Sequence, residues 1–484
     1  MSDYIIFAKR VSLVAIVQIL LNGKGLITLP ILTKFLGTYD FGIWIQILAT
    51  VSLLQPFVHL GLGSAIVRFL PAKEKEKIVE GLFTVIFVAF LSGLALCLIL
   101  ILIYKSVPMS LLKDFSPNIF IIVLPIIILE SLTSLAINSF RILGQIKRYS
   151  IVILLENLIE IVLIFLLVSS GYGLIGALFS VLISRTITFC IILILLIKYA
   201  GFAFPNFSLI SPFLSYSLPF IPFAFFSIII DTSDRYIIGF YLGPTPVGIY
   251  SAASSIGGIV AIFLAFISYV LGPTVSKSFD NSKIEEVKNY LAYSWKYILM
   301  LSIPSAFGLS VLGKPLLNAL TTPEFVTAGQ IIIPFTALSM ILNSANGIFG
   351  QVIQLYKVTR IFPIAFAAAA VVNLVLNLIL VPLFGIVGAA IATLSAYVVV
   401  SIIIFIISRR YMKFFMNITF IVKTTLASSV MALIILKMNP TGTFDVILSI
   451  LIGAVVCFAV LIGLKGFGEN EKLSLIHFIR RLRH

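Results

Sequence analysis

The stretch GLFTVIFVAFLSGLALCLILILIY, residues 81–104, runs for 24 residues without a charged side chain. A helix of this length rises about 36 Å, enough to cross a hydrocarbon core about 30 Å thick. Other apolar runs of 18 or more residues follow along the chain. Since lipid offers peptide groups no hydrogen-bond partner, each run must close its backbone hydrogen bonds within a helix. The sequence therefore predicts an all-α membrane protein.

The composition of the whole chain agrees with this prediction. Of its 484 residues, 61% are hydrophobic and 11% are charged, whereas soluble domains are about half apolar and about a quarter charged. The alternation typical of outer-membrane barrel strands is absent from the sequence. Cys97, Cys190 and Cys457 lie in separate apolar runs, so we expect no disulfide framework and no metal site. A phosphate-binding loop of the GxxxxGK[ST] type is also absent, and we expect no cofactor.

Turn signals and charge clusters divide the chain into about fourteen expected spans. The tightest turns are expected at Gly171-Tyr172-Gly173 and at Phe384-Gly385. The first apolar run is long and contains Lys24, so it is interpreted as a span and not as a cleaved signal peptide. The expected spans cover residues 11–36, 41–63, 81–104, 117–140, 150–170, 174–197, 212–238, 247–271, 294–316, 329–352, 361–384, 386–408, 418–437 and 444–464.

The distribution of Lys and Arg predicts that both termini are cytoplasmic. With this orientation 23 of the 33 Lys and Arg residues fall on the inner side and about six on the outer side. Orientation then accounts for the net charge of +15, and a nucleic-acid partner is not expected. The segment Ser276–Tyr293 is expected to form a short amphipathic helix on the cytoplasmic surface, and the basic residues after Lys465 a cytoplasmic tail.

Two short motifs indicate an internal duplication. FLGTYDFGIW at 35–44 recurs as YLGPTPVGIY at 241–250, and GLIGA at 173–177 recurs as GIVGA at 385–389, at offsets of 206 and 212. We infer an N-terminal six-helix lobe over residues 1–200, a C-terminal six-helix lobe over 201–410, and two extra spans with a basic tail over 411–484. Because six is even, the lobes share one orientation. Such parallel repeats are typical of transporters, with the substrate path between the halves.

Several stretches carry a resemblance to a known family. They are LPILTKFLGTYDFGIW at 29–44, RILGQIKRYS at 141–150, GLIGALFSVLISR at 173–185 and SLPFIPFAFFSIIIDTSDRYIIGFYLGPTPVGIYSAA at 217–253. Together with the span count, these stretches resemble the polysaccharide exporters of the multidrug/oligosaccharidyl-lipid/polysaccharide (MOP) superfamily, the group that contains the O-antigen flippase Wzx.

The resemblance implies a V-shaped pair of six-helix lobes, similar to multidrug exporters of the MATE type, that works by alternating access. It implies a substrate of undecaprenyl-pyrophosphate-linked oligosaccharide, such as an O-antigen repeat unit, moved across a bacterial inner membrane, with coupling to H⁺ or Na⁺ and with polymerase or chain-length proteins as partners. Lipid II flippases and teichuronic-acid exporters share much of the pattern. A cation-coupled multidrug exporter remains an alternative, although twelve spans and an acidic pocket are more usual there. A membrane enzyme is not expected, since the outer loops are too short to carry a catalytic cluster.

Charged residues inside the expected spans are candidate functional residues, because each costs at least about 2.5–3.5 kcal/mol to insert. Glu160 lies 12 residues before Tyr172 and Arg185 lies 13 residues after it, which places both about 18–20 Å from the same turn. We expect a Glu160–Arg185 pair, with Glu156, one turn away on the same helix face, left to another partner or protonated. A structural clamp and a role in proton coupling both stay open.

Lys24 is expected near the middle of the first span, between Gly23 and Gly25. The offset of 206 places Lys24 and Asp231 at one depth in the two lobes, where Lys24 would rest against Asp231 when no substrate is bound. We expect Lys24 to meet an anionic pyrophosphate, the alternative being a structural ion pair. Asp231 and Arg235, four residues apart, can pair on one helix face, and with Asp234 they are interpreted chiefly as structural.

Two expected spans at equivalent positions in the lobes carry polar stripes. One stripe consists of Glu130, Ser134, Asn138 and Arg141, and the other of Thr336, Asn343, Gly347, Gly350 and Gln354. Such stripes face protein or water in a membrane protein. Either they hold helices together, or they form a cavity wall that hydrogen-bonds sugar hydroxyls.

The charge distribution generates a test of orientation. A reporter that is active only in the cytoplasm, fused after His484, should be active, because the positive-inside bias places the C-terminus there. A matched fusion at residue 110, in an expected outer loop, should be inactive. Activity of a periplasm-specific reporter at His484 would contradict the predicted orientation.

Overall fold

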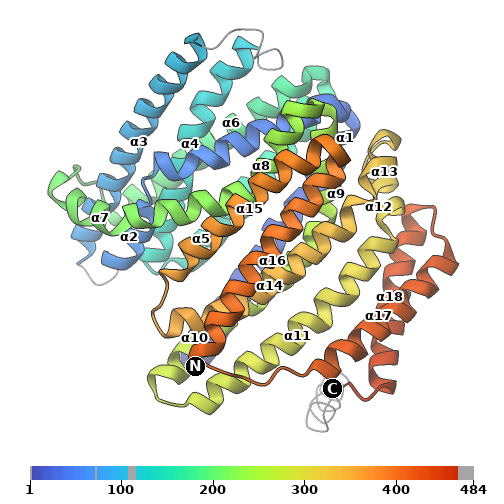
Figure 1. Cartoon of the computed structure of the whole chain (residues 1–484). Helices are drawn as coiled ribbons and strands as arrows, with labels where there is room; N and C mark the ends of the chain where they lie inside the picture. Colours follow the sequence, from blue (N-terminus) through green and yellow to red (C-terminus); the bar gives the residue numbers. More distant parts are fainter. Residues whose placement is uncertain (1–2, 71–73, 107–115, 467–484) are drawn as a thin grey trace. The chain divides into compact units, whose positions relative to one another are not determined.

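The computed structural model describes residues 3–70, 74–106 and 116–466, and every regular element in these ranges is helical (Figure 1). The predicted all-α membrane fold is confirmed. The basic tail predicted beyond Lys465 lies largely outside the described residues. The α-helices are α1 (Asp3–Val58), α2 (Leu62–Phe69), α3 (Lys75–Ser106), α4 (Pro117–Ile142), α5 (Ile146–Leu167), α6 (Gly173–Ala200), α7 (Ile210–Ser217), α8 (Ile221–Leu242), α9 (Pro244–Gly257), α10 (Ile262–Asp280), α11 (Ile284–Val311), α12 (Gly313–Leu320), α13 (Pro323–Gly329), α14 (Ile332–Leu355), α15 (Ile361–Phe384), α16 (Ile386–Tyr411), α17 (Ile418–Met438) and α18 (Thr443–Gly463).

Within the described ranges, nine helical runs are long and apolar enough to cross a membrane, or eleven if two bent pairs each count as one span. Two of the nine runs contain a break where the sequence predicts a junction. Gly37 interrupts α1 with a positive φ of 71°, and Gly171 (φ 88°) lies in the turn between α5 and α6. Because α5 packs against α6, the run Ile146–Ala200 is a hairpin of two helices. The count of fourteen stays a prediction.

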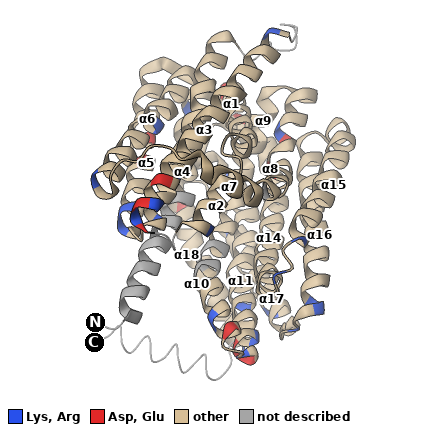
Figure 2. Cartoon of the chain, turned by 90° about the vertical axis from the view of Figure 1, so that its left-hand side faces the viewer, with Lys and Arg blue, Asp and Glu red and all other residues tan. Residues whose placement is uncertain are grey.

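The surface of the long helices is apolar. Large side chains such as Leu98, Leu102 and Ile194 are more than half exposed, and charged residues are sparse along the helices (Figure 2). An apolar surface of this extent is not stable in water and suits contact with lipid chains.

The described helices form two compact units. The first comprises residues 1–252 and 360–396, and the second comprises residues 253–359 and 397–484. In the first unit, α2 to α7 surround a buried core that includes Leu82, Ala136 and Ile192. In the same unit α8 packs against α1 and α15. These units follow different boundaries from the lobes expected at residues 200 and 410, and the division into lobes stays a prediction.

The two copies of the repeated LG…GI motif touch each other in the first unit. A Cβ at Gly42 in α1 would overlap the backbone of Pro244, and a Cβ at Gly248 in α9 would overlap the backbone of Thr38. Glycine at both positions therefore allows two helix backbones to approach closely, as small residues do at membrane helix interfaces. This contact explains in physical terms why the motif contains glycine in both copies.

In the second unit the segment 276–293 differs from the sequence prediction. The expected single amphipathic helix is wrong, since α10 ends at Asp280 and α11 begins at Ile284, with Ser282 at a positive φ of 58°. The turn is charged, with Lys283 2.8 Å from Glu286. Elsewhere in this unit α17 packs against α11 and α18.

The glycine contact predicts a selective loss of stability. Gly42→Ala places a methyl group against the Pro244 backbone, which cannot move aside as a flexible side chain could, so we expect a loss of about 1–3 kcal/mol. Gly258→Ala is the matched control, because no atom lies within 4 Å of the added Cβ. Thermal unfolding of the purified variants should show a lower Tm for Gly42→Ala alone. Equal Tm values would contradict the close approach of α1 and α9.

Candidate functional site

Five charged side chains from four helices of the first unit meet in one cluster. Lys24 comes from α1, Glu130 from α4, Glu156 and Glu160 from α5, and Arg185 from α6. The Lys24 Nζ lies 2.6 Å from Glu160 Oε1, and the Arg185 Nη1 lies 3.3 Å from Glu160 Oε2. Arg185 also donates through Nε to Glu130 and through Nη1 to Glu156. We call these five residues the charge cluster.

Arg185 is the centre of the charge cluster, because its guanidinium contacts all three carboxylates. The side chains of Arg185 and Glu160 are 11% and 5% exposed. The side chain of Lys24 is less enclosed, at 22%. Three carboxylates and two cations leave the cluster with a formal charge of −1. Removing one partner of a buried ion pair in the cluster is costly, since the charge of the other partner stays buried without compensation.

Helix geometry explains why these residues meet. Lys24 precedes the break at Gly37 by 13 residues, Glu160 precedes Gly171 by 11, and Arg185 follows Gly173 by 12. Glu130 follows the start of α4 by 13 residues. At about 1.5 Å per residue, all four lie about 17–20 Å from one end of the bundle. The Ser184 hydroxyl donates to the Glu156 carbonyl oxygen at 3.2 Å and ties α5 to α6 at this level.

The structure brings Glu160 and Arg185 together, as the hairpin geometry predicts, and it adds two members that sequence reasoning placed elsewhere. The duplication predicts Asp231 as the resting partner of Lys24, whereas the structure pairs Lys24 with Glu160. Glu130 was assigned to a polar stripe on its own helix, whereas its carboxylate accepts from Arg185. Depths were compared only within the α5–α6 hairpin and between Lys24 and Asp231. A comparison of the depths of all charged residues within the expected spans would have found the Lys24–Glu160 and Glu130–Arg185 contacts.

Polar residues of α8 make hydrogen bonds within the helix and to two neighbouring helices. The Arg235 Nη1 donates to the Asp231 carbonyl oxygen at 2.9 Å, and Asp234, which is buried, accepts from the Arg235 backbone N–H at 2.8 Å. The Ser233 hydroxyl donates to Asn373 Oδ1 of α15 at 2.6 Å, and the Tyr236 hydroxyl lies 2.8 Å from Thr50 Oγ1 of α1. The first two bonds lie within α8, and the last two join α8 to α15 and to α1.

The two polar stripes have different surroundings. On α4, the Asn138 Nδ2 donates to the Ser134 carbonyl oxygen at 2.8 Å, and Arg141 Nη1 donates to Asn138 Oδ1 at 3.4 Å. On α14, in the second unit, Asn343 is half-buried. Three residues further, the buried Asn346 has no hydrogen-bond partner at either amide atom among the described residues. Sequence analysis missed Asn346, although it lies one turn from Asn343.

The described residues contain no group of three or more His, Cys, Asp or Glu side chains suited to a metal ion. The three carboxylates of the charge cluster surround a guanidinium instead. The arrangement can exchange one cationic partner for another, since Lys24 has one carboxylate contact and is the less enclosed of the two cations.

Comparison with known families gives two matches. The family described as polysaccharide biosynthesis protein matches residues 7–279, and the family described as MatE matches residues 229–379. The first match covers more than half of the chain and includes the whole charge cluster.

Two relatives come from Haloferax volcanii. A probable low-salt glycan biosynthesis flippase, Agl15, is 29% identical over 187 residues, which is 39% of this chain and 39% of that protein. A probable flippase, AglR, is 28% identical over 239 residues, or 48% of this chain and 50% of that protein. The chain therefore spans half or less of the length of these two relatives.

Solved structures share the fold over most of the chain. The lipid II flippase MurJ in an inward closed conformation has a TM-score of 0.75 at 21% identity, covering 92% of this chain and 97% of that one. An inward-facing multidrug resistance MATE family transporter of the MOP superfamily has a TM-score of 0.66 at 14% identity, covering 82% and 97%. At these identities the likeness establishes the fold.

The charge cluster generates a stability prediction. Arg185→Ala leaves three carboxylates facing one another in a buried site, so we expect a loss of about 3–5 kcal/mol, by analogy with broken buried pairs. The matched control is Arg410→Ala, which removes an exposed guanidinium. Thermal unfolding of purified protein should show a large fall in Tm for Arg185→Ala only, partly restored when Glu130→Gln and Glu156→Gln are added. An unchanged Tm would contradict the central position of Arg185.

Proposed function

We propose a transport function for this chain, which belongs to the polysaccharide biosynthesis protein family of the MOP superfamily. In this proposal the chain is a flippase that moves lipid-linked oligosaccharides from one leaflet of a membrane to the other. The names of its relatives, a glycan biosynthesis flippase and a second flippase, support this proposal, and the fold shared with a lipid II flippase is compatible with it. We propose transport without catalysis, so the chain is not an enzyme.

The observation that carries the proposal is the position of Lys24. A pyrophosphate that crosses a bilayer must be met by a cation, since an isolated charge in hydrocarbon is prohibitively costly. Lys24 lies about 20 Å from the end of its helix at Gly37, deep in the bundle, and its side chain is less enclosed than that of Arg185. It is therefore the cation of the charge cluster that we assign to the substrate.

The pairing of Lys24 with Glu160 suggests how an unloaded carrier tolerates this cation. Without substrate, Glu160 neutralises Lys24 at 2.6 Å. A pyrophosphate competes with Glu160 for the ammonium group, and Glu160 keeps its contact with Arg185 at 3.3 Å. The cluster then retains three carboxylates and one cation, a formal charge of −2. Uptake of one H⁺ or one Na⁺ restores the original charge, and this is the coupling that we propose.

For the substrate we propose an oligosaccharide repeat unit on undecaprenyl pyrophosphate, such as an O-antigen unit, in a bacterial inner membrane with both termini of the chain in the cytoplasm. Asn138, Arg141 and Asn343 are proposed to bind sugar hydroxyls or phosphate, and Asp231 and Arg235 to shape the path. Polymerase or chain-length proteins are proposed as partners. Lipid II and teichuronic-acid precursors are the nearest alternatives in the same substrate class.

A second candidate is a cation-coupled multidrug exporter. The net negative charge of the cluster favours it, because excess carboxylate attracts a cationic drug as well as a coupling ion. The two candidates differ in the charge of the cargo. Export of a lipophilic cation from cells that express the chain, with no effect on lipid-linked glycan, would support the exporter and contradict the flippase.

Depletion of the protein in its own cells tests the flippase proposal. We expect lipid-linked glycan to accumulate in the cytoplasmic leaflet, where membrane-impermeant sugar-modifying enzymes added outside do not reach it. Restored expression should return the glycan to the outer leaflet. A glycan that remains accessible from outside during depletion would contradict the proposal.

Lys24 variants test the assigned cation. Lys24→Ala should abolish complementation of the depleted strain while the protein stays in the membrane at its normal level. Lys24→Arg should retain part of the activity, because the charge persists while its geometry changes. Lys34→Ala is the matched control on the same helix, since Lys34 is exposed. Full complementation by Lys24→Ala at normal expression would refute the role of Lys24.

A further inference from the structure

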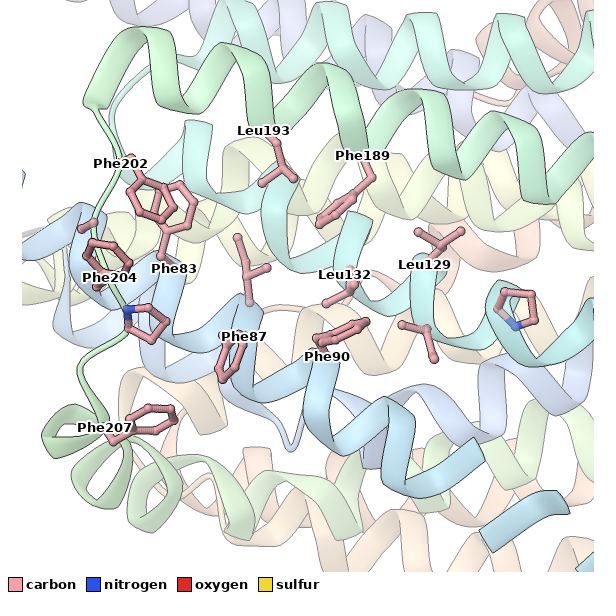
Figure 3. A pocket seen from close by; sticks show the side chains of 15 residues that line it. Phe83, Phe87, Phe90, Leu129, Leu132, Phe189, Leu193, Phe202, Phe204 and Phe207 are labelled. Atoms are coloured by element: carbon pink, nitrogen blue, oxygen red, sulfur yellow. The ribbon is translucent and has the colours of Figure 1, made fainter. Parts of the chain in front are cut away.

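The first unit contains an apolar cavity of about 790 Å³ that is separate from the charge cluster. Its walls are formed by α3, α4, α6 and the segment 202–207 that follows α6. Figure 3 shows phenylalanine and leucine side chains from these elements pointing into one space. Every lining residue is apolar: Phe83, Ile86, Phe87, Phe90, Pro125, Ile128, Leu129, Leu132, Phe189, Leu193, Phe202, Ala203, Phe204, Pro205 and Phe207.

The segment after α6 is fixed in place as one wall of this cavity. The Asn206 backbone N–H donates to Thr84 Oγ1 at 2.8 Å, and its side-chain amide donates to Glu80 Oε1 at 2.8 Å. Edge-to-face ring contacts join Phe83 to Phe202 at 5.1 Å and Phe87 to Phe207 at 6.0 Å. The cavity is therefore built into the fold, and a ligand does not have to order the segment first.

A cationic edge lies next to this cavity, around Tyr199. The Lys75 Nζ donates to the Tyr199 carbonyl oxygen at 2.8 Å and lies 4.8 Å from the Tyr199 ring centroid. The Arg148 guanidinium lies 4.4 Å from the same ring, and Arg148 Nη1 is buried without a hydrogen-bond partner among the described residues. Tyr199 precedes the lining residue Phe202 by three residues, so the chain places these cations towards the Phe202 end of the cavity.

The cavity extends along α3, away from this edge. Phe83 and Phe90 follow Lys75 by 8 and 15 residues, or about 12 and about 22 Å along α3. Some of its rings reach the surface of the unit, with Phe204 82% and Phe202 59% exposed. A ligand that fills this shape has an anionic group at one end and a long apolar chain that lies along α3.

We propose that this cavity binds the polyisoprenoid chain of the lipid carrier, with the carrier's pyrophosphate at Arg148 and Lys75. The inference rests on the proposed function, whose substrate unites one long apolar chain with a phosphate group at its end. The cationic edge belongs to the end of the bundle that the charge distribution predicts to be cytoplasmic, the leaflet from which the flippase takes its substrate. The cavity holds the carrier there before its head group reaches Lys24.

Binding of a sugar-free polyprenyl pyrophosphate to the purified full chain tests this proposal, with the uncharged polyprenol as a second probe. Ala203→Trp fills the cavity, so it should weaken binding of both probes about tenfold or more. Phe204→Ala removes an exposed ring without crowding the core and should weaken both probes less. Arg148→Gln should weaken binding of the pyrophosphate about tenfold and leave polyprenol binding unchanged, because a hydrogen bond to a charged group is lost.

Two matched controls keep the test specific. Ile194→Trp adds the same ring at an exposed position of α6 outside the cavity, and Lys77→Gln removes an exposed charge two residues from Lys75. Both should bind each probe as the unaltered chain does. Unchanged binding by Ala203→Trp and Phe204→Ala, or equal displacement of the probe by an anionic phospholipid, would overturn the proposal.

Two outcomes distinguish a failure of the cavity inference from a failure of the flippase proposal. If Lys24→Ala abolishes binding of polyprenyl pyrophosphate while Ala203→Trp does not, the carrier binds at the charge cluster. In that case the cavity inference fails and the flippase proposal stands. If the unaltered chain binds the probe through the cavity but lipid-linked glycan does not accumulate on depletion, the flippase proposal fails alone.

Discussion

The constraint on which the structure depends is that a charge placed in hydrocarbon needs a partner within reach. Each charge costs at least about 2.5–3.5 kcal/mol to insert, and the first unit carries five in one cluster. They are tolerable because four helices deliver them to one depth, where Arg185 contacts three carboxylates and Lys24 contacts Glu160. The cluster therefore fixes how α1, α4, α5 and α6 are positioned along one another, since a shift of one helix by a single turn would strand a charge.

In our proposal, the same interactions that stabilise the unit leave one cation exchangeable. Arg185 is held by three carboxylates, so its removal from the cluster is costly, whereas Lys24 has one carboxylate contact and a less enclosed side chain. We propose that an anionic substrate competes for Lys24, the cation with fewer carboxylate contacts, and that a coupling ion restores the charge. On this proposal Arg185 chiefly serves stability and Lys24 chiefly serves transport, so removing one and removing the other are expected to have different effects. The aromatic cavity between α3, α4 and α6 would serve the other half of the substrate, its chain.

Helix lengths and depths could be predicted from the sequence, whereas side-chain directions could not. Apolar runs such as residues 81–104 predicted the all-α membrane fold, and the spacing around Tyr172 placed Glu160 near Arg185. The duplication predicted Asp231 as the resting partner of Lys24, whereas the structure pairs Lys24 with Glu160. An offset aligns positions along two helices without stating which way each side chain points. The turn at Ser282 was missed, although the run Asp280-Asn281-Ser282 consists of residues that favour turns. The cavity could not be foreseen, because its wall depends on Asn206 bonding to Glu80 and Thr84, more than 120 residues earlier in the chain.

Reconstituted translocation is the measurement that tests the central claim most directly. Purified chain in liposomes that contain a fluorescent oligosaccharide on polyprenyl pyrophosphate should move the labelled lipid between leaflets, as followed by a quencher that does not cross the membrane. Movement should require an H⁺ or Na⁺ gradient, and it should stop with Lys24→Ala although that variant reconstitutes normally. If the labelled lipid stays in its original leaflet with the unaltered chain under every gradient, or moves equally fast with Lys24→Ala, the account of the charge cluster as a substrate site is contradicted.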